Sequence, residues 1–173
     1  MKRILVIGCP GAGKTYFSKK LGQLLNYPVV HMDWLYWRED KTTVSREQLL
    51  EKMLPYLKED QWIIDGNYHH TLSVRLEYAT DVYFLKLSHE ECVQGILERI
   101  DKKRDDIPWV ETKEDAEKLI EWIKTYEERT RAEEEALLEQ YQHVKVHVLS
   151  SRKEVNDYLN NLLKKQALEL KLV

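Results

Sequence analysis

The sequence predicts an α/β fold in which a parallel sheet is covered by helices on both faces. Short apolar runs alternate along the chain with longer segments whose apolar residues recur every three or four positions, which is the pattern of strands that alternate with helices. The first apolar run, Ile4–Ile7, is continuous rather than alternating, as expected for a central strand covered on both faces. A glycine-rich segment follows it directly. Parallel sheets bind their ligands at this edge, where the strands end.

The first helix is expected between two strands. Residues 14–26 carry apolar side chains at helical spacing, and Pro28 cannot continue that helix. Residues 29–32 then form a short second strand. Further strands are expected at residues 62–64, 82–87 and 144–149.

Capping signals and one polar stretch delimit the later helices. Ser45 with Gln48, and Ser88 with Glu91, have the spacing of a capping box at the start of a helix. Residues 101–112 are polar and interrupt the helical pattern. The remaining segments are a long helix at 113–141, a final helix around 155–163, and a tail at 167–173 that fits either a helix end or an edge strand.

Length and composition favour one globular domain over residues 1–173. The chain is 43% hydrophobic and 33% charged, with a net charge of −3, and nucleic-acid binders usually carry a basic excess. The first apolar run is too short for a signal sequence or a membrane span. Cys9 and Cys92 have no metal-ligand spacing. We therefore expect a cytoplasmic protein, a monomer or weak homodimer, with no nucleic-acid or membrane partner.

The glycine-rich segment Gly8–Thr15 reads GCPGAGKT and matches the phosphate-binding pattern GxxxxGK[ST] in full. Its glycines allow backbone N–H groups to turn around a phosphate, and the helix that follows adds its positive end. Lys14 should reach the β- and γ-phosphates, and the Thr15 hydroxyl should ligate magnesium. The expected nucleotide-binding residues here are Gly8, Pro10, Gly11, Ala12, Gly13, Lys14, Thr15 and Tyr16.

Carboxylates follow the second and third strands. Asp33 could accept a proton from a substrate hydroxyl or hold water around magnesium, and the alternative is a turn aspartate. Asp65 ends an apolar run, as a second magnesium residue beside Thr15 would, or as a plain turn residue. The expected acceptor-binding residues are Asp33, Trp34, Asp65, Gly66, Asn67 and Arg75.

Arginines supply the positive charge that phosphoryl transfer requires. Arg129 and Arg131 are candidate catalytic residues, or surface partners of the glutamates four positions later. Arg99, at the end of the helix that follows the fourth strand, is a further candidate for this charge. Arg152 could stack on a purine base or cap a helix.

Motifs along the whole chain resemble those of adenylate-kinase-like and shikimate-kinase-like P-loop kinases: the glycine loop, IIDGNY at 63–68, and DVYFLKL at 81–87 followed by a helix that ends in Arg99. HMDWLYW at 31–37 and SSRKEVNDYL at 150–159 look most similar to the topology modulation protein group. This resemblance implies a three-layer sandwich with sheet order 2-3-1-4-5 and a small lid near 101–114. In adenylate kinases an arginine stands at the position of His69, which argues against AMP as acceptor.

Three functions follow from these residues. The first is a kinase that transfers the γ-phosphoryl group of ATP, with Mg²⁺, to a small-molecule or nucleotide acceptor. The second is a GTPase-like switch, against which stands Tyr68 at the position where a DxxG motif needs glycine, together with the lack of an NKxD motif. The third is an ATP-binding regulatory protein of the topology-modulation type with weak or no kinase activity.

Overall fold

The computed structural model describes residues 1–169 and contains a five-stranded sheet in the order β2-β3-β1-β4-β5, with every neighbouring pair parallel. The expected strand order is confirmed. The elements, in chain order, are β1 Arg3–Gly8, α1 Lys14–Leu25, β2 Val29–His31, α2 Met32–Tyr36, α3 Arg46–Leu57, β3 Trp62–Asp65, α4 His69–Tyr78, β4 Asp81–Leu85, α5 His89–Leu97, α6 Lys113–Tyr126, η1 Glu127–Arg131, α7 Ala132–Gln140, β5 Lys145–Leu149 and α8 Arg152–Glu169.

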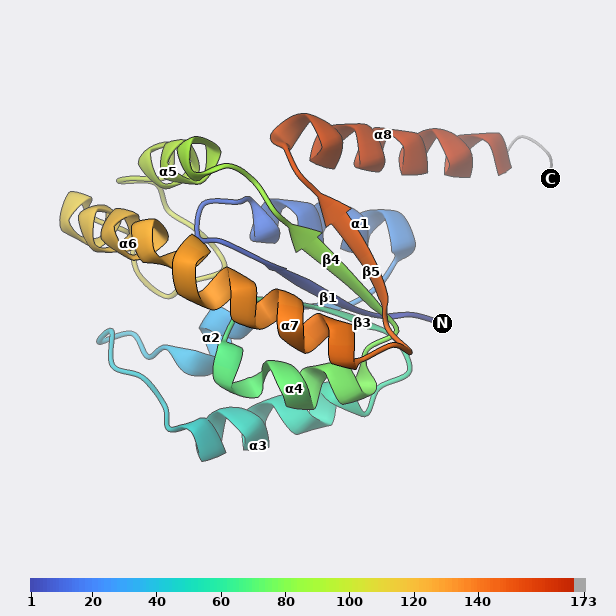
Figure 1. Ribbon diagram of the computed structural model, residues 1–173, viewed down its shortest axis with the longest axis horizontal. Coiled ribbons are helices and arrows are strands. Elements are labelled where there is room, and N and C mark those ends of the chain that lie inside the picture. The colour runs from blue at the N-terminus through green and yellow to red at the C-terminus, as the bar shows by residue number, and fades with distance from the viewer. Residues whose placement is uncertain (170–173) are drawn as a thin grey trace.

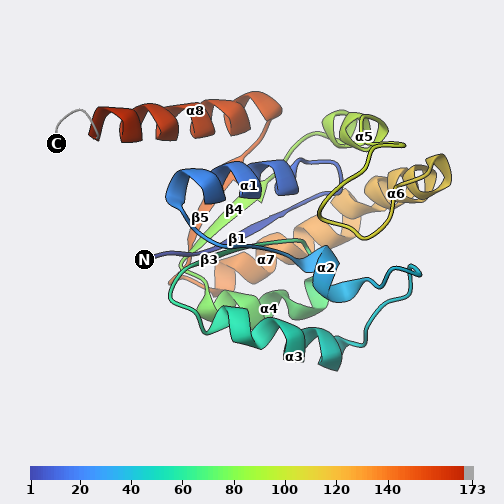
Figure 2. The same cartoon turned by 180° about the vertical axis from the view of Figure 1, so that it is seen from behind.

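The central strand β1 divides two apolar cores. Its side chains alternate, so that Ile4 and Val6 pack with α1, α5, α6 and α8, whereas Leu5 and Ile7 pack with α3, α4 and α7. Figures 1 and 2 show the resulting three layers, with α1 and α8 on one face of the sheet and α3, α4 and α7 on the other. All four of these β1 side chains are fully buried, which explains why the run has no polar alternation.

Both expected capping boxes are present. The Ser45 hydroxyl accepts from the Gln48 N–H at 3.2 Å, and the Ser88 hydroxyl accepts from the Glu91 N–H at 3.2 Å. Each satisfies a backbone donor that the first turn of a helix leaves without a partner.

Two features differ from the sequence prediction, and the tail is described in part. The single long helix expected at 113–141 is divided into α6 and α7 by the π-helical turn η1. Two helices, α2 and α4, form where none was predicted. In the tail, α8 continues to Glu169, and the last four residues of the predicted alternation lie outside the described residues. No helix within 1–169 has the length and apolarity needed to cross a membrane.

Candidate active site

The glycine loop connects β1 to the first turn of α1. Gly11 and Gly13 have φ values of 79° and 86°, in the left-handed region that glycine adopts at no steric cost. Gly13 caps α1, whose first turn contains no acidic residue. A Cβ atom on Gly13 would have no neighbour within 4 Å. The backbone N–H groups of this turn therefore border open space beside the positive end of a twelve-residue helix.

The loop is held against α5 by a close backbone approach. A Cβ atom on Gly11 would lie 1.9 Å from the carbonyl oxygen of Cys92, and one on Gly95 would lie 2.1 Å from the carbonyl oxygen of Gly11. Gly95 is thus as necessary to the position of the loop as Gly11 itself. The glycine pattern at 8–15 does not include it.

Lys14 and Thr15 are both engaged by groups of the protein. Lys14 Nζ donates to the carbonyl oxygens of Gly8 at 2.8 Å and Cys9 at 3.0 Å. Burial lowers the pKa of this amine, while the carboxylates of Asp33 and Asp65 act in the opposite direction.

Residues 101–112, most of the lid expected at 101–114, lie against the loop without regular secondary structure. Thr15 Oγ1 donates to Asp106 Oδ2 at 2.7 Å, and Lys19 pairs with Asp105. Asp106 is buried, and its pKa is lowered to about 2: burial raises the pKa, but the hydrogen bonds and charge of Arg104 and the hydrogen bond from Thr15 outweigh it. Asp106 is therefore an ionised carboxylate beside the Thr15 hydroxyl.

Arg99, which follows α5, and Arg104, in the segment 101–112, share one buried glutamate, Glu111. Arg99 Nη2 donates to Glu111 Oε1 at 2.7 Å, and Arg104 Nη1 donates to Glu111 Oε2 at 2.7 Å. Arg104 also forms two hydrogen bonds to Asp106. Both guanidinium groups thus lie beside the glycine loop with protein carboxylates as partners.

The carboxylates expected after β2 and β3 meet at the same edge of the sheet. Tyr68 Oη donates to Asp33 Oδ1 at 2.5 Å, and His31 Nδ1 lies 2.8 Å from Asp65 Oδ2. Burial raises the pKa of Asp33, and the hydrogen bond from Tyr68 partly opposes it. Burial lowers the pKa of His31, but the hydrogen bond and charge of Asp65 outweigh it and the net shift is upward.

A buried chain of hydrogen bonds joins the glycine loop to α7. The Gly8 N–H donates to Asn67 Oδ1 at 2.7 Å, Asn67 Nδ2 donates to Tyr126 Oη at 3.4 Å, and Tyr126 Oη donates to Glu134 Oε2 at 2.5 Å. Glu134 is fully buried. Its position depends on η1, because a π turn contains one more residue than an α turn and so changes which residues of α7 face inward.

Arg75 has a different position from the one expected for an acceptor-binding residue. Its side chain is fully buried and donates to the backbone carbonyls of Gly66, Asn67 and Tyr68. Burial lowers its pKa to about 10. Because its hydrogen bonds go to the backbone of this loop, Arg75 shapes the chain after β3 and does not line the cleft described below.

Arg129 and Arg131 are not among the described residues that line the cleft. Arg129 is exposed, and Arg131 donates to the Leu87 carbonyl at 3.1 Å and lies over the Tyr126 ring. The alternative expectation was that Arg129 pairs with Glu133 and Arg131 with Glu135. Both glutamates have other partners in the structure. Glu133 lies 3.3 Å from His69, and Glu135 pairs with Lys86 at 2.5 Å.

Trp34 and Arg152 flank the site. Trp34 Nε1 donates to the Asp105 carbonyl at 2.6 Å and thus ties α2 to the lid. Arg152 donates to both carboxylate oxygens of Glu98 at 3.1 Å and to the Glu91 carbonyl at 3.2 Å. Its predicted contact with a purine base stays a prediction.

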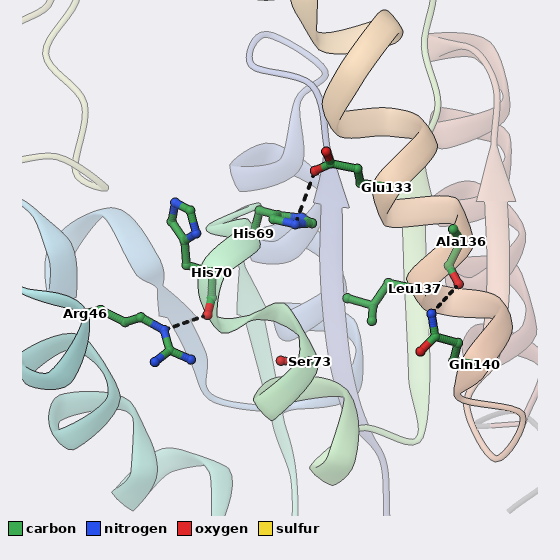
Figure 3. Close-up of a pocket in the computed structure, with 8 residues that line it drawn as sticks. All are labelled: Arg46, His69, His70, Ser73, Glu133, Ala136, Leu137 and Gln140. Carbon is green, nitrogen blue, oxygen red and sulfur yellow. Dashed lines mark hydrogen bonds and ion pairs between the residues drawn. The ribbon is translucent and has the colours of Figure 1, made fainter.

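A cleft of about 1210 Å³ opens where these groups meet. Its lining includes Lys14, Thr15, Asp33, Asp65, Asn67 and Arg99. A side pocket of about 550 Å³ shares His69, His70 and Glu133 with it. Figure 3 shows this side pocket between α4 and α7, with His69 joined to Glu133 and Arg46 joined to the backbone of His70.

The residues present fit a magnesium–nucleotide complex. The open turn at Gly13 and the acid-free start of α1 suit phosphate oxygens, and Lys14 borders them. The hydroxyl of Thr15 and the carboxylate of Asp106 are oxygen ligands of the kind that Mg²⁺ prefers, and Asp65 lines the same cleft. Groups of three or more potential His, Cys, Asp or Glu ligands are not found within 1–169.

Among the site residues that the sequence prediction missed, His31 and Asp106 differ in whether the sequence carries a signal for them. His31 could have been found, because β2 pairs with β3 and the register sets His31 beside Asp65. Asp106 could not, because it lies in an irregular segment whose fold depends on Arg104 and Glu111.

Solved structures share this architecture along almost the whole chain. A shikimate kinase from Acinetobacter baumannii in complex with shikimate is 16% identical, with a TM-score of 0.57 over 100% of this chain and 96% of that one. A shikimate kinase from Bacteroides thetaiotaomicron is 19% identical, with a TM-score of 0.56 over 96% and 98%. A deoxyadenosine kinase from M. mycoides with bound dATP is 11% identical, with a TM-score of 0.50 over 95% and 99%.

The fold is that of the P-loop kinases. Because all three identities are below 20%, the likeness concerns the fold. A scan against protein-family models finds no match, and a search of curated proteins finds none either.

Proposed function

We propose that this protein is a kinase that transfers the γ-phosphoryl group of ATP to the hydroxyl of a small molecule in the cytoplasm. The observation that carries the proposal is the meeting of a complete phosphate-binding loop with Asp33, Arg99 and Arg104 in one cleft. A loop alone would support nucleotide binding. A carboxylate at the next strand end adds a group that can take a proton from an acceptor.

Each chain segment has a role in this proposal. Backbone N–H groups of Gly11–Thr15 and the Lys14 amine hold the phosphates. When bound, Mg²⁺ would neutralise charge on the β- and γ-phosphate oxygens, and Thr15, with Asp65 and Asp106, would hold it. Asp33 orients the acceptor hydroxyl and accepts its proton. Closure of the lid excludes water and limits hydrolysis of ATP.

The positive charge at the γ-phosphate is assigned to Arg99 and Arg104, which line the cleft, in place of Arg129 and Arg131. Nucleotide binding would then be an exchange of partners. The phosphates would take the place of Glu111 and Asp106 at these guanidinium groups. Arginine contacts of this kind contribute roughly 10³-fold or more to the rate.

The proposal is tested by ADP production from ATP over a panel of hydroxyl-bearing acceptors. Lys14→Ala should lower acceptor-dependent turnover by at least about 100-fold, because Lys14 is the one lysine of the phosphate-binding pattern. Lys20→Ala changes an exposed lysine of the same helix and should leave turnover within twofold. Equal activity of Lys14→Ala and the parent protein would contradict the proposal.

The proposal includes similarity to the topology modulation protein group. The alternative to a kinase is an ATP-binding regulatory protein of that type with weak or no kinase activity. Folded protein that binds ATP without any acceptor-dependent ADP production would favour that alternative. Salt-sensitive binding to duplex DNA would support it further.

A further inference from the structure

A row of four aromatic rings starts beside Asp33, on the side of the cleft assigned to the acceptor. The Tyr68 and Tyr36 ring centroids are 4.8 Å apart, those of Tyr36 and Trp37 are 5.2 Å apart, and those of Trp37 and Trp109 are 5.5 Å apart, with each pair edge to face. Of these residues, Tyr68, Trp37 and Trp109 line the cleft. We call these three the aromatic wall. It begins at Asp33, because Tyr68 donates its hydroxyl to that carboxylate.

The aromatic wall joins two distant parts of the chain. Trp37 follows α2, whereas Trp109 belongs to the lid. Lys41 lies 5.9 Å from the centre of the Trp109 ring and is paired with Asp115 at 2.8 Å. The lid therefore contributes Trp109 to the cleft together with Arg104 and Asp106, which lie on the phosphate side. A flat ring bound against the aromatic wall would contact Trp37, which follows α2, and Trp109 of the lid at the same time.

The charges near the aromatic wall disfavour an anionic acceptor. Asp33 lies at one end of the aromatic wall, and Asp65 and Glu133 line the same cleft. Three lysines of the lining, Lys19, Lys41 and Lys118, are each already paired with a carboxylate. Arg75, which the sequence predicted to bind the acceptor, instead donates its hydrogen bonds to backbone carbonyls of the loop after β3. In the described part of the chain, Arg99 and Arg104 are the arginines of the lining, and both are on the phosphate side with Glu111. A phosphate or a carboxylate on an acceptor that lies against Tyr68 and Asp33 would therefore meet a carboxylate of the same sign.

From these observations we infer that the acceptor is a hydroxyl-bearing molecule with a flat, uncharged or cationic ring, of the nucleoside class, rather than a phosphorylated or carboxylated compound. The inference rests on the proposed kinase function and adds the class of acceptor to it. Aromatic side chains recognise such rings through stacking and edge contacts, which tolerate differences between bases.

The phosphoryl transfer to such an acceptor needs no co-reactant other than ATP. The acceptor oxygen forms a bond to the γ-phosphorus, and the bond from that phosphorus to the β,γ-bridging oxygen breaks, so that ADP leaves with the electron pair. The hydroxyl proton passes to Asp33 through Oδ2, because Oδ1 already accepts from Tyr68. The products are ADP and a phosphorylated ring compound.

The test compares matched acceptors that differ by one phosphate. ADP production is measured with adenosine and AMP, guanosine and GMP, thymidine and dTMP, and with shikimate and glycerol as a carboxylated and a ring-free acceptor. We expect at least one nucleoside to exceed its own monophosphate, shikimate and glycerol by about tenfold or more in kcat/KM.

Variants of the aromatic wall provide a second readout. Trp37→Leu and Trp109→Leu should each raise KM for the nucleoside by about tenfold while KM for ATP stays within twofold, and Trp37→Phe should restore most of the affinity. Tyr56→Leu, a change to an exposed residue of α3 outside the cleft, should alter neither constant. The unchanged KM for ATP shows that each variant is folded.

Two results would overturn the inference and have different meanings. Turnover that favours a monophosphate, shikimate or glycerol over every nucleoside would refute the acceptor class and leave the kinase proposal standing. Folded, ATP-binding protein with no acceptor-dependent turnover would remove the kinase proposal and this inference with it.

Discussion

Tyr68 and Asp33 form the hydrogen bond that most directly controls the proposed chemistry. Burial raises the pKa of the Asp33 carboxyl, and the hydroxyl of Tyr68 limits that increase by donating to the ionised form. An ionised Asp33 is the form that can accept a proton. The activity should therefore fall on the acidic side as Asp33 becomes protonated.

Tyr68→Phe should move the acidic limb of the kcat profile to higher pH. The substitution removes the donor that stabilises the charged carboxylate, so a larger fraction of Asp33 is protonated at a given pH. The measurement is kcat against pH for both proteins, with Tyr78→Phe on the same helix α4 as the control. A limb that stays in place would show that another group titrates.

Glu134 gives the stability of the protein a pH dependence of known sign. Burial raises its pKa from 4.5 to about 7, against the opposing effects of the Tyr126 hydrogen bond and of Lys14, Arg75 and Arg131. The folded protein thus retains a proton that the unfolded chain releases. Its contribution to stability is complete below pH 4.5 and is lost as the pH rises through about 7.

Glu134→Gln should flatten this part of the curve, because glutamine does not titrate. The free energy of unfolding of the parent protein should decrease by at most roughly 3 kcal/mol more than that of the variant between these limits. Urea unfolding across the pH range measures it, with Glu139→Gln at an exposed position of α7 as the control. Parallel curves for Glu134→Gln and the parent would contradict the assignment.

At the scale of the element, the capping boxes are local and were visible in the sequence. Ser45 and Gln48 are three positions apart, so the start of the helix is enough to bring them together and no distant part of the chain is needed. The same holds for the glycine loop, whose function lies in its own backbone.

Ser45→Ala should destabilise the protein by about 1 kcal/mol, because the Gln48 N–H at the start of α3 loses its acceptor. Ser45→Asp keeps an acceptor and should recover most of the loss. Thermal or urea unfolding of the three proteins measures the difference. An alanine variant as stable as the parent would mean that water replaces the hydroxyl without cost.

The elements that were not predicted lack a local signal. α4 buries Thr71 and Arg75 beside Leu72 and Leu76, so its inward face is not an apolar stripe. α2 has five residues, which is too few for a period to appear. η1 depends on the packing of Tyr126 and Glu134, which only the folded chain brings together. Asp33 was found because its position after a strand is a local fact, whereas Asp106 reaches Thr15 across 91 residues.

At the scale of the whole molecule, the nucleotide should act as a stabilising ligand. The cleft is lined by two parts of the chain that are far apart in sequence, the glycine loop with the start of α1 and the segment 103–122. A ligand that binds these parts in the folded state stabilises all of them together.

Mg²⁺ with ATP at about 100 times its Kd should stabilise the fold by about 2.7 kcal/mol, which for a domain of this size corresponds to a Tm increase of roughly 5–10 °C. Thermal unfolding with and without the nucleotide measures it. Lys14→Ala should lose most of the increase, and a protein with no increase at any nucleotide concentration would contradict nucleotide binding in the cleft.

The π turn at η1 has a consequence for comparing this chain with its relatives. Each residue of an α-helix advances the direction of the side chain by about 100°. The additional residue in η1 therefore rotates the side chains of α7 about the helix axis relative to those of α6. A chain that lacked one residue here would keep its helix length but would turn Glu134 away from Tyr126 and present a different side chain to the glycine loop. A one-residue gap aligned at 127–131 is therefore a marker by which relatives with and without this buried connection can be told apart.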